Sequence, residues 1–241
     1  MSEPLYQCTG CGKHYERRKF KCPGCNTPGI TRLYKYVPYN EHSMAILINK
    51  EAWFSPAHQF TDPFEFRFAI SEKLHNGIPI NKESVDNARQ DSMNLGVFCL
   101  TETNDNSLMW SHYADGHHGF CIGFERSETN ELGGQLCVPV IYPEDNAVPI
   151  FKLEALAERK AFARLATTKA KLWEYEREWR MISKEPGGGL YPIPGRISAI
   201  IFGFRMAPQS RKTIRNILGK DILYSQAHQA DDSYTLDIRA C

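Results

Sequence analysis

Four cysteines near the start of the chain form two Cys-x-x-Cys pairs, Cys8 with Cys11 and Cys22 with Cys25, separated by ten residues. Each pair places two thiols on one tight turn of the backbone. The segment that carries them, residues 1–30, contains few aliphatic side chains and cannot bury an apolar core of its own. A segment this short needs another source of stability, such as a bound metal or a cross-link.

Two such turns supply four thiolates in tetrahedral geometry, which is the ligand set of a structural zinc site. We therefore predict a small N-terminal zinc ribbon in which the metal provides the folding energy. Gly10 and Gly24 lie inside the pairs, where the absence of a side chain lets backbone amides turn toward sulfur. Two disulfides or two redox-active pairs are the alternative, but redox Cys-x-x-Cys motifs seldom come doubled in a short segment without a core.

Basic and aromatic residues surround the cysteine pairs: Lys13, Arg17, Arg18, Lys19, Lys21, Tyr15 and Phe20. This mixture is typical of surfaces that bind nucleic acid. A solvated hairpin between two metal-binding turns explains the same residues, so both interpretations stay open.

The chain has 241 residues, enough for one sizeable domain and a small appendage. Its net charge of +1 provides no overall field that would recruit nucleic acid or a membrane. We find neither a secretory signal nor an apolar run close to the roughly 20 residues that span a bilayer. The four remaining cysteines are scattered, which fits a reducing compartment. These features predict a cytoplasmic protein that has no membrane partner.

Composition changes near residue 30, so we predict a zinc-ribbon-like module over 1–30 and a main domain over 31–241. Hydrophobic patterns in the main domain predict both strands and helices. The strands are expected at 32–37, 96–100, 119–124, 138–142, 175–183 and 197–204, and the helices at 41–50 (with Asn40 as N-cap), 104–115, 153–172 and 209–218. Because strands and helices do not alternate strictly, the fold class is α+β.

Three parts of the main domain carry specific motifs. The first part consists of residues 33–36, 53–56 and 61–65. The second consists of residues 98–102 and the motif Met-Trp-x-x-Tyr at 109–113. The third is the motif Trp-x-Tyr-Glu-x-Glu-x-Arg at 173–180. Together they resemble a bacterial family catalogued only as domain-of-unknown-function family 2971, over roughly residues 31–205. The cysteine-rich N-terminal segment looks like an addition to that domain. The family name implies no activity, so any chemistry must come from the residues.

The order of a strand with a basic residue, a helix, and a strand ending in Ser also resembles the opening of ADP-ribosyltransferase folds. That resemblance implies split, mostly antiparallel sheets around a cleft that binds NAD, with catalytic glutamates on a late strand. The corresponding pair here is Glu176 and Glu178, which we expect on one face of a strand. One carboxylate would stabilise the oxocarbenium-like state as nicotinamide leaves, and the other would orient or deprotonate the acceptor.

The same resemblance implies roles for four further residues. Lys35 replaces the Arg or His that usually contacts NAD, although a lysine cannot copy the bidentate grip of arginine on phosphate. Ser55 falls where a serine supports the site, and Trp110 or Tyr113 would stack on nicotinamide. Core packing is the alternative for Trp110 and Tyr113.

Arg180 shares the predicted strand face of the two glutamates, so a structural ion pair with Glu178 is the alternative to catalysis. The leading hypothesis is an NAD-dependent ADP-ribosyltransferase-like enzyme that modifies nucleic acid or protein, such as a toxin or defence effector. A non-catalytic module that binds nucleic acid or a partner protein is the alternative. A nuclease-like enzyme using Lys171 and both glutamates is less favoured, because no Asp is placed to complete a metal site.

Overall fold

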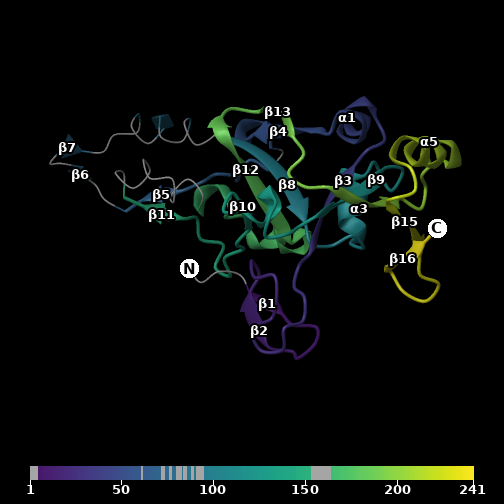
Figure 1. Ribbon diagram of the computed structural model, residues 1–241. Helices are drawn as coiled ribbons and strands as arrows, with labels where there is room; N and C mark the ends of the chain where they lie inside the picture. Colours follow the sequence, from purple (N-terminus) through teal and green to yellow (C-terminus); the bar gives the residue numbers. More distant parts are fainter. Residues whose placement is uncertain are drawn as a thin grey trace.

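A ten-stranded, mostly antiparallel sheet forms the main domain of the computed structural model (Figure 1). The structure describes residues 5–60, 62–71, 95–152 and 164–241, and positions 74, 75, 78, 79, 83, 86, 87 and 90. The strands of this sheet are β3 (Arg32–Val37), β4 (Glu51–Pro56), β8 (Leu95–Thr101), β9 (Phe120–Glu125), β10 (Cys137–Pro139), β12 (Glu178–Pro186), β13 (Gly189–Pro192), β14 (Ile197–Phe202), β15 (Leu223–Gln229) and β16 (Leu236–Ala240). With the helices described below, this arrangement confirms the α+β class.

The sheet runs in the order β10-β12-β8-β3-β9-β14-β15-β16, and β14 and β15 form its parallel pair. The sheet forks at β8, because two different strands pair with the same strand. Near the start of β8, Ser55 and Pro56 of β4 pair with Val97 and Gly96. At its end, Thr101 pairs with Tyr34 of β3. The two partners diverge between these points, and β13 extends the β4 branch.

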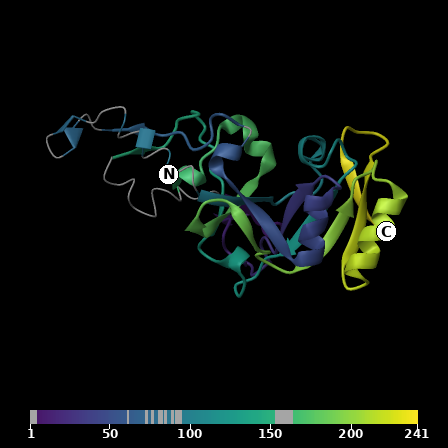
Figure 2. The same ribbon diagram turned by 90° about the horizontal axis from the view of Figure 1, so that it is seen from above.

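Helices cover both faces of the sheet (Figure 2). Helices α1 (Glu41–Asn49) and α5 (Pro208–Leu218) pack on one face, where Leu47 and Ile214 join the main apolar cluster. Helix α3 (Ser107–Tyr113) lies on the other face, where Trp110 joins a separate cluster. Successive side chains of a strand point to opposite faces. In β9, accordingly, Ile122 belongs to the first cluster and Cys121 to the second.

Local sequence signals confirm several predicted elements. Asn40 caps α1 in a capping box with Ser43, and each side chain bonds the other residue's backbone N–H. Such caps satisfy amides that the first turn of a helix leaves free. The helices predicted over 104–115 and 209–218 appear as α3 and α5, and the strand predicted over 197–204 appears as β14.

The N-terminal module is a small hairpin of β1 (Leu5–Gln7) and β2 (His14–Glu16), which projects from the main sheet (Figure 1). Lys21 and Pro28 add an isolated bridge after the hairpin. Short elements complete the described chain: η1 (Ala57–Gln59), β5 (Ala69–Ile70), β6 (Leu74–His75), β7 (Ile78–Pro79), η2 (Glu131–Gly133), β11 (Ile150–Phe151) and η4 (Lys171–Glu176). No helix among the described residues is both long and apolar enough to span a bilayer.

Two predictions near the end of the resembling region need correction. The strand predicted over 175–183 begins only at Glu178, because residues up to Glu176 form the 3-10 helix η4 and Arg177 is left-handed, with φ 45°. The helix predicted over 153–172 lies partly outside the described residues, since 153–163 are not described. Its described part is helical only to Ala166. Lys169 therefore lies in an extended segment between a helical end and η4.

Candidate functional site

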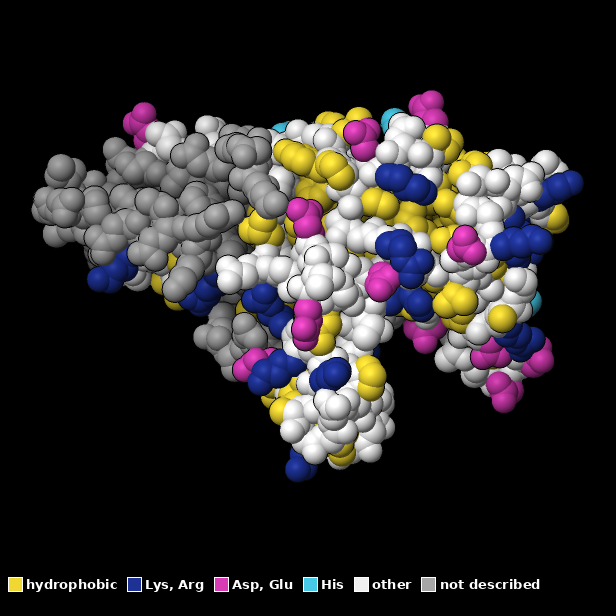
Figure 3. Space-filling view, viewed as in Figure 1, with side chains coloured by type: hydrophobic (Ala, Val, Ile, Leu, Met, Phe, Trp, Pro, Cys, Tyr) yellow, Lys and Arg dark blue, Asp and Glu magenta, His cyan; other side chains and the backbone are white. Residues whose placement is uncertain are grey.

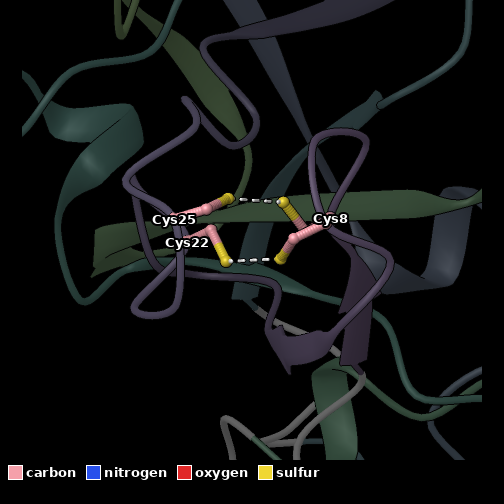
Figure 4. Close-up of side chains that lie close together, drawn as sticks. Cys8, Cys22 and Cys25 are labelled. Carbon is pink, nitrogen blue, oxygen red and sulfur yellow. Dashed lines mark hydrogen bonds between the residues drawn. The ribbon is translucent and has the colours of Figure 1, made fainter.

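The four N-terminal cysteines converge at the tip of the hairpin module (Figure 4). Their sulfur atoms all lie within 4.8 Å of one another. The Cys8 and Cys25 sulfurs are 3.4 Å apart, and those of Cys11 and Cys22 are 3.6 Å apart. Ligands at about 2.3 Å in a tetrahedral zinc site are about 3.8 Å from each other. The four thiols are free and too far apart for disulfides, so the cluster fits a metal ion such as zinc.

Backbone amides support this cluster as the two Cys-x-x-Cys turns predict. The N–H of Gly10 donates to the sulfur of Cys8 at 3.3 Å, and the N–H of Gly24 donates to Cys22 at 3.4 Å. Hydrogen bonds from the side chain and backbone of Thr27, together with those from Cys8 and Cys11, lower the pKa of the Cys25 thiol to about 6. Donors aimed at sulfur favour the thiolate, which is the form that binds a metal.

Two arginines join the module to the main domain. Arg17 donates to the buried carboxylate of Glu102, with Nε–Oε1 2.6 Å and Nη2–Oε1 2.5 Å. Arg126, from the main domain, donates to the carbonyl of Arg18 at 2.7 Å and stacks over Phe20 at 4.1 Å. Arg17 and Arg18 are thus engaged in docking the module, which weakens the prediction that the basic residues around the cysteines form a nucleic-acid surface.

Glu102 also contacts two residues beside Glu178, one on each side of it in the sequence. Its Oε1 accepts from Trp179 Nε1 at 2.8 Å, and its Oε2 accepts from Arg177 Nη2 at 2.8 Å. Arg177 separates Glu176 from Glu178 in the sequence. One buried carboxylate therefore connects the cysteine module with the side chains of Arg177 and Trp179, which lie on either side of Glu178 in the sequence.

A pocket of about 230 Å³ opens where the sheet forks at β8. It brings together Lys35, Tyr113 and the Glu176–Glu178 pair, which are widely separated from one another in the sequence. Its walls come from β3, the segment after η1, β8, α3, η4 and β12. The other lining residues are Tyr34, Tyr36, Gln59, Phe60, Asp62, Glu65, Cys99, Leu100, Thr101, Met109, Lys169, Trp173 and Arg180.

Two of the predicted residues do not line this pocket. Ser55 lies half-buried in β4, opposite Val97, on the other branch of the fork. Trp110 is fully buried and packs edge-on against Tyr36, with ring centroids 5.0 Å apart. Its indole N–H donates to the Asn104 carbonyl at 3.0 Å. Core packing, the alternative stated for Trp110, therefore matches its surroundings.

Arg180 is the most completely bonded charge in the pocket. Its guanidinium donates twice to Glu178, at 2.8 and 3.0 Å, and twice to Glu65, at 2.7 and 3.0 Å. A fifth bond, of 2.7 Å, goes to the Ala166 carbonyl. Arginine has five N–H groups, so every donor has a partner. The ion pair between Glu178 and Arg180, stated as the alternative to catalysis, is present and buried.

Lys169 is the second cation of the cluster. Its ammonium lies 2.6 Å from Glu176, 3.2 Å from Glu178 and 3.4 Å from Glu65. These three carboxylates raise its pKa, although burial acts in the opposite direction. Sequence reasoning gave no role to Lys169 or Glu65, because no local pattern places them near β12.

Glu176 and Glu178 do not share a strand face as predicted, since Glu176 ends η4. Their carboxylates still meet at Lys169, because the left-handed Arg177 turns the chain between them. Tyr113 donates to the Oε1 of Glu176 at 2.6 Å. Tyr113 is 36% exposed, so this hydrogen bond lies at the mouth of the pocket.

The pKa values of the two glutamates shift in opposite directions, although burial acts on both in the same way. Burial raises the pKa of Glu176, and the neighbouring Glu178 carboxylate raises it further, against the opposing effect of Lys169. Burial would also raise the pKa of Glu178, but Arg180 and Lys169 lower it to about 2. Relative to a free glutamate, the pocket thus favours the ionised form of Glu178 and the protonated form of Glu176.

Lys35 is the third cation of the pocket, and it bonds to the backbone. Its ammonium donates to the Cys99 carbonyl at 3.0 Å and lies 4.4 Å above the Phe98 ring. Burial lowers its pKa. No carboxylate among the described residues forms an ion pair with it, which leaves donors free for an anionic ligand.

The model of the family described as Protein of unknown function (DUF2971) matches residues 109–181, which include most of α3 together with Lys169, Glu176, Glu178 and Arg180. This region contains two of the motifs on which the resemblance was based, Met-Trp-x-x-Tyr and Trp-x-Tyr-Glu-x-Glu-x-Arg, whereas residues 33–65 and 98–102 lie outside it. Searches of curated proteins and of solved structures give no match. The comparisons show no link to ADP-ribosyltransferases.

We expect the reduced protein, purified without chelator, to carry one metal ion per chain by elemental analysis. Cys11→Ser removes one thiolate and is expected to bring the metal content close to zero. Cys241→Ser, which removes an exposed thiol outside the cluster, should keep it. Metal removal is expected to unfold residues 5–28 and to leave the main domain folded but less stable. Reduced wild-type protein without stoichiometric metal would contradict the site.

Glu178→Gln is expected to lower the free energy of unfolding by about 3–5 kcal/mol, because it leaves Arg180 with an incomplete set of buried partners. Urea denaturation measures the change. Glu125→Gln is the matched control, since it breaks an exposed pair with Arg196 and should cost about 1 kcal/mol or less. Equal losses in the two variants would show that the buried pair is not structural.

The stability difference between wild type and Glu178→Gln should depend on pH. Because the pKa of Glu178 is lowered to about 2, the unfolded chain takes up a proton at this residue below about pH 4.5 that the folded chain does not. Its contribution to stability is therefore complete above that pH and is lost as the pH falls toward 2. Urea denaturation from neutral pH downward should show the difference shrinking, and a constant difference would refute this assignment.

Proposed function

We propose that the pocket is the catalytic site of an NAD-dependent transferase of the ADP-ribosyl class, with nucleic acid or protein as acceptor. The observation that supports this proposal is the pair of adjacent carboxylates, Glu176 and Glu178, whose pKa values are displaced in opposite directions. Glycosyl chemistry uses such a pair, one carboxylate as a fixed negative charge and one to move a proton.

In the proposed reaction, the bond between the ribose C1′ and the pyridinium nitrogen of NAD breaks. Its electron pair leaves with nicotinamide, which becomes neutral, and positive charge develops on the ribose. The ionised carboxylate of Glu178 stabilises that charge in a partly desolvated site. The acceptor attacks C1′, and its proton passes to Glu176. Tyr113, which is bonded to Glu176, holds this carboxylate in place.

The walls of the pocket suit one end of a dinucleotide. Tyr34, Phe60 and Trp173 offer aromatic faces on which a flat ring can stack. A volume of about 230 Å³ is smaller than the roughly 300–1,000 Å³ of typical ligand sites, so only nicotinamide and its ribose would be enclosed. Lys35, with free donors, would meet the phosphates beyond the ribose. Ser55 and Trp110 have no part in this proposal, because they lie outside the pocket.

We further propose that the metal of the cysteine module is zinc and that its role is structural. Four sulfur ligands fill a tetrahedral shell and leave no open position for catalysis. The distance between sulfurs, 3.4 to 3.6 Å in two pairs, supports this geometry.

Glu176→Gln is expected to lower the rate of nicotinamide release from NAD by roughly a hundred- to ten-thousandfold, the usual contribution of a general acid or base. The fold should persist, because Lys169 keeps Glu178 and Glu65 as partners. Chromatographic detection of nicotinamide measures the rate. Glu174→Gln is the control, since Glu174 is exposed and lies on the same 3-10 helix but outside the pocket.

Thermal melting in millimolar NAD provides the binding test. An NAD-induced rise in melting temperature for the wild type would support the pocket as the NAD site. Absence of both a shift and nicotinamide release would refute the transferase and favour the non-catalytic binding module.

A further inference from the structure

One stretch of the described chain, around α5, combines several basic residues with no acidic one, and it lies at an end of the molecule remote from the cysteine module (Figures 1 and 3). Between Arg205 and Lys220 there are five basic residues and no acidic one, in a chain whose net charge is only +1. The five are Arg205, Arg211, Lys212, Arg215 and Lys220, which we call the α5 basic surface. Dark blue side chains gather over this end in Figure 3.

No member of the α5 basic surface forms an ion pair with a carboxylate among the described residues. Elsewhere, basic side chains are commonly neutralised: Lys171 pairs with Glu144 and Glu174, and Arg196 pairs with Glu125. Positive charge that its own fold does not neutralise is available to an anionic partner.

Two arginines of this surface are held in place by uncharged groups. Arg211 donates to the side-chain oxygen of Gln226, and Arg215 stacks over the Tyr224 ring at 4.4 Å. Both partners lie on β15, so the two guanidiniums lean over the same strand. Each keeps further N–H donors free, in the planar arrangement that binds phosphate through two bonds. Because the side chains are already ordered, binding costs less conformational entropy.

The stability of α5 does not account for these charges. Its first turn contains no acidic residue, although the positive end of the helix dipole favours one there. Arg211 and Arg215 are four residues apart, a spacing at which like charges destabilise a helix by about 0.2–0.5 kcal/mol. Arg215 lies in the last turn, where the helix dipole favours a cation, but Arg211 and Lys212 gain no such stabilisation, so the helix alone does not account for the group of basic residues.

We propose that the α5 basic surface binds the phosphate backbone of nucleic acid. Five cations along one helix and its flanks match the regular negative charge of that backbone. A membrane surface fits less well, because helices that lie in membranes turn their apolar face outward, whereas α5 buries Ile214 against the sheet. The surface does not line the pocket, so this proposal is independent of the proposed transferase.

Fluorescence anisotropy with a labelled DNA duplex, over a series of salt concentrations, tests the proposal. Each phosphate contact contributes about −0.9 to the slope of log K against log salt. The triple variant Arg211→Gln, Lys212→Gln, Arg215→Gln is expected to make the slope shallower by about 2–3 and to weaken binding correspondingly. Arg196→Gln is the matched control. It removes one exposed positive charge that Glu125 already neutralises, so its slope should equal that of the wild type.

Circular dichroism first confirms that the triple variant is folded. If it is not, Lys212→Gln with Lys220→Gln takes its place, because both lysines are exposed, and the slope should change by about 2. Wild type that fails to bind DNA, or folded variants that keep the wild-type slope, would overturn the proposal. Tighter binding to phosphatidylserine vesicles than to DNA would also overturn it, in favour of a membrane surface.

Discussion

The buried guanidinium of Arg180 is the interaction on which the rest of this site depends. Moving a charge from water into a protein costs several kcal/mol even after relaxation, so it is tolerated only where partners surround it. Here the partners come from three places in the chain: Glu178 on the same strand, Glu65 more than a hundred residues earlier, and the Ala166 carbonyl. Because all three segments bond to the Arg180 guanidinium, this one side chain fixes their positions relative to each other.

Counting charges around Arg180 explains why the two glutamates differ. Three carboxylates contact only two cations, since Lys35 bonds to a carbonyl instead. Glu178 contacts both cations, whereas Glu176 contacts Lys169 alone. The excess negative charge is therefore least compensated by cations at Glu176, and protonation of Glu176 removes it. The imbalance of charge in this buried ion-pair network is therefore also what would allow Glu176 to accept the proton in the proposed reaction.

Predictions from sequence succeeded where the signal was local. The doubled Cys-x-x-Cys spacing predicts the four-sulfur cluster, and Asn40 predicts the start of α1, because neither depends on distant residues. The Glu178–Arg180 pair follows from strand alternation. Prediction failed for Glu65 and Lys169, whose roles arise only when distant segments meet. It also misplaced Glu176, because its alternation with Glu178 looks like a strand while Arg177 adopts a left-handed conformation that ordinary residues rarely take.

Glu102 has a further consequence, because it binds Arg17 of the cysteine module and also Arg177 and Trp179, which lie on either side of Glu178. Glu102 thus connects the module to Arg177 and Trp179, the chain neighbours of Glu178, although Glu102 does not itself line the pocket. Thermodynamic linkage between two sites is reciprocal. A pocket ligand that prefers the docked arrangement must tighten metal binding by the same factor by which the metal tightens the ligand. The affinity of the four cysteines for metal would then change when a ligand binds in the pocket, although none of the cysteines contacts that pocket.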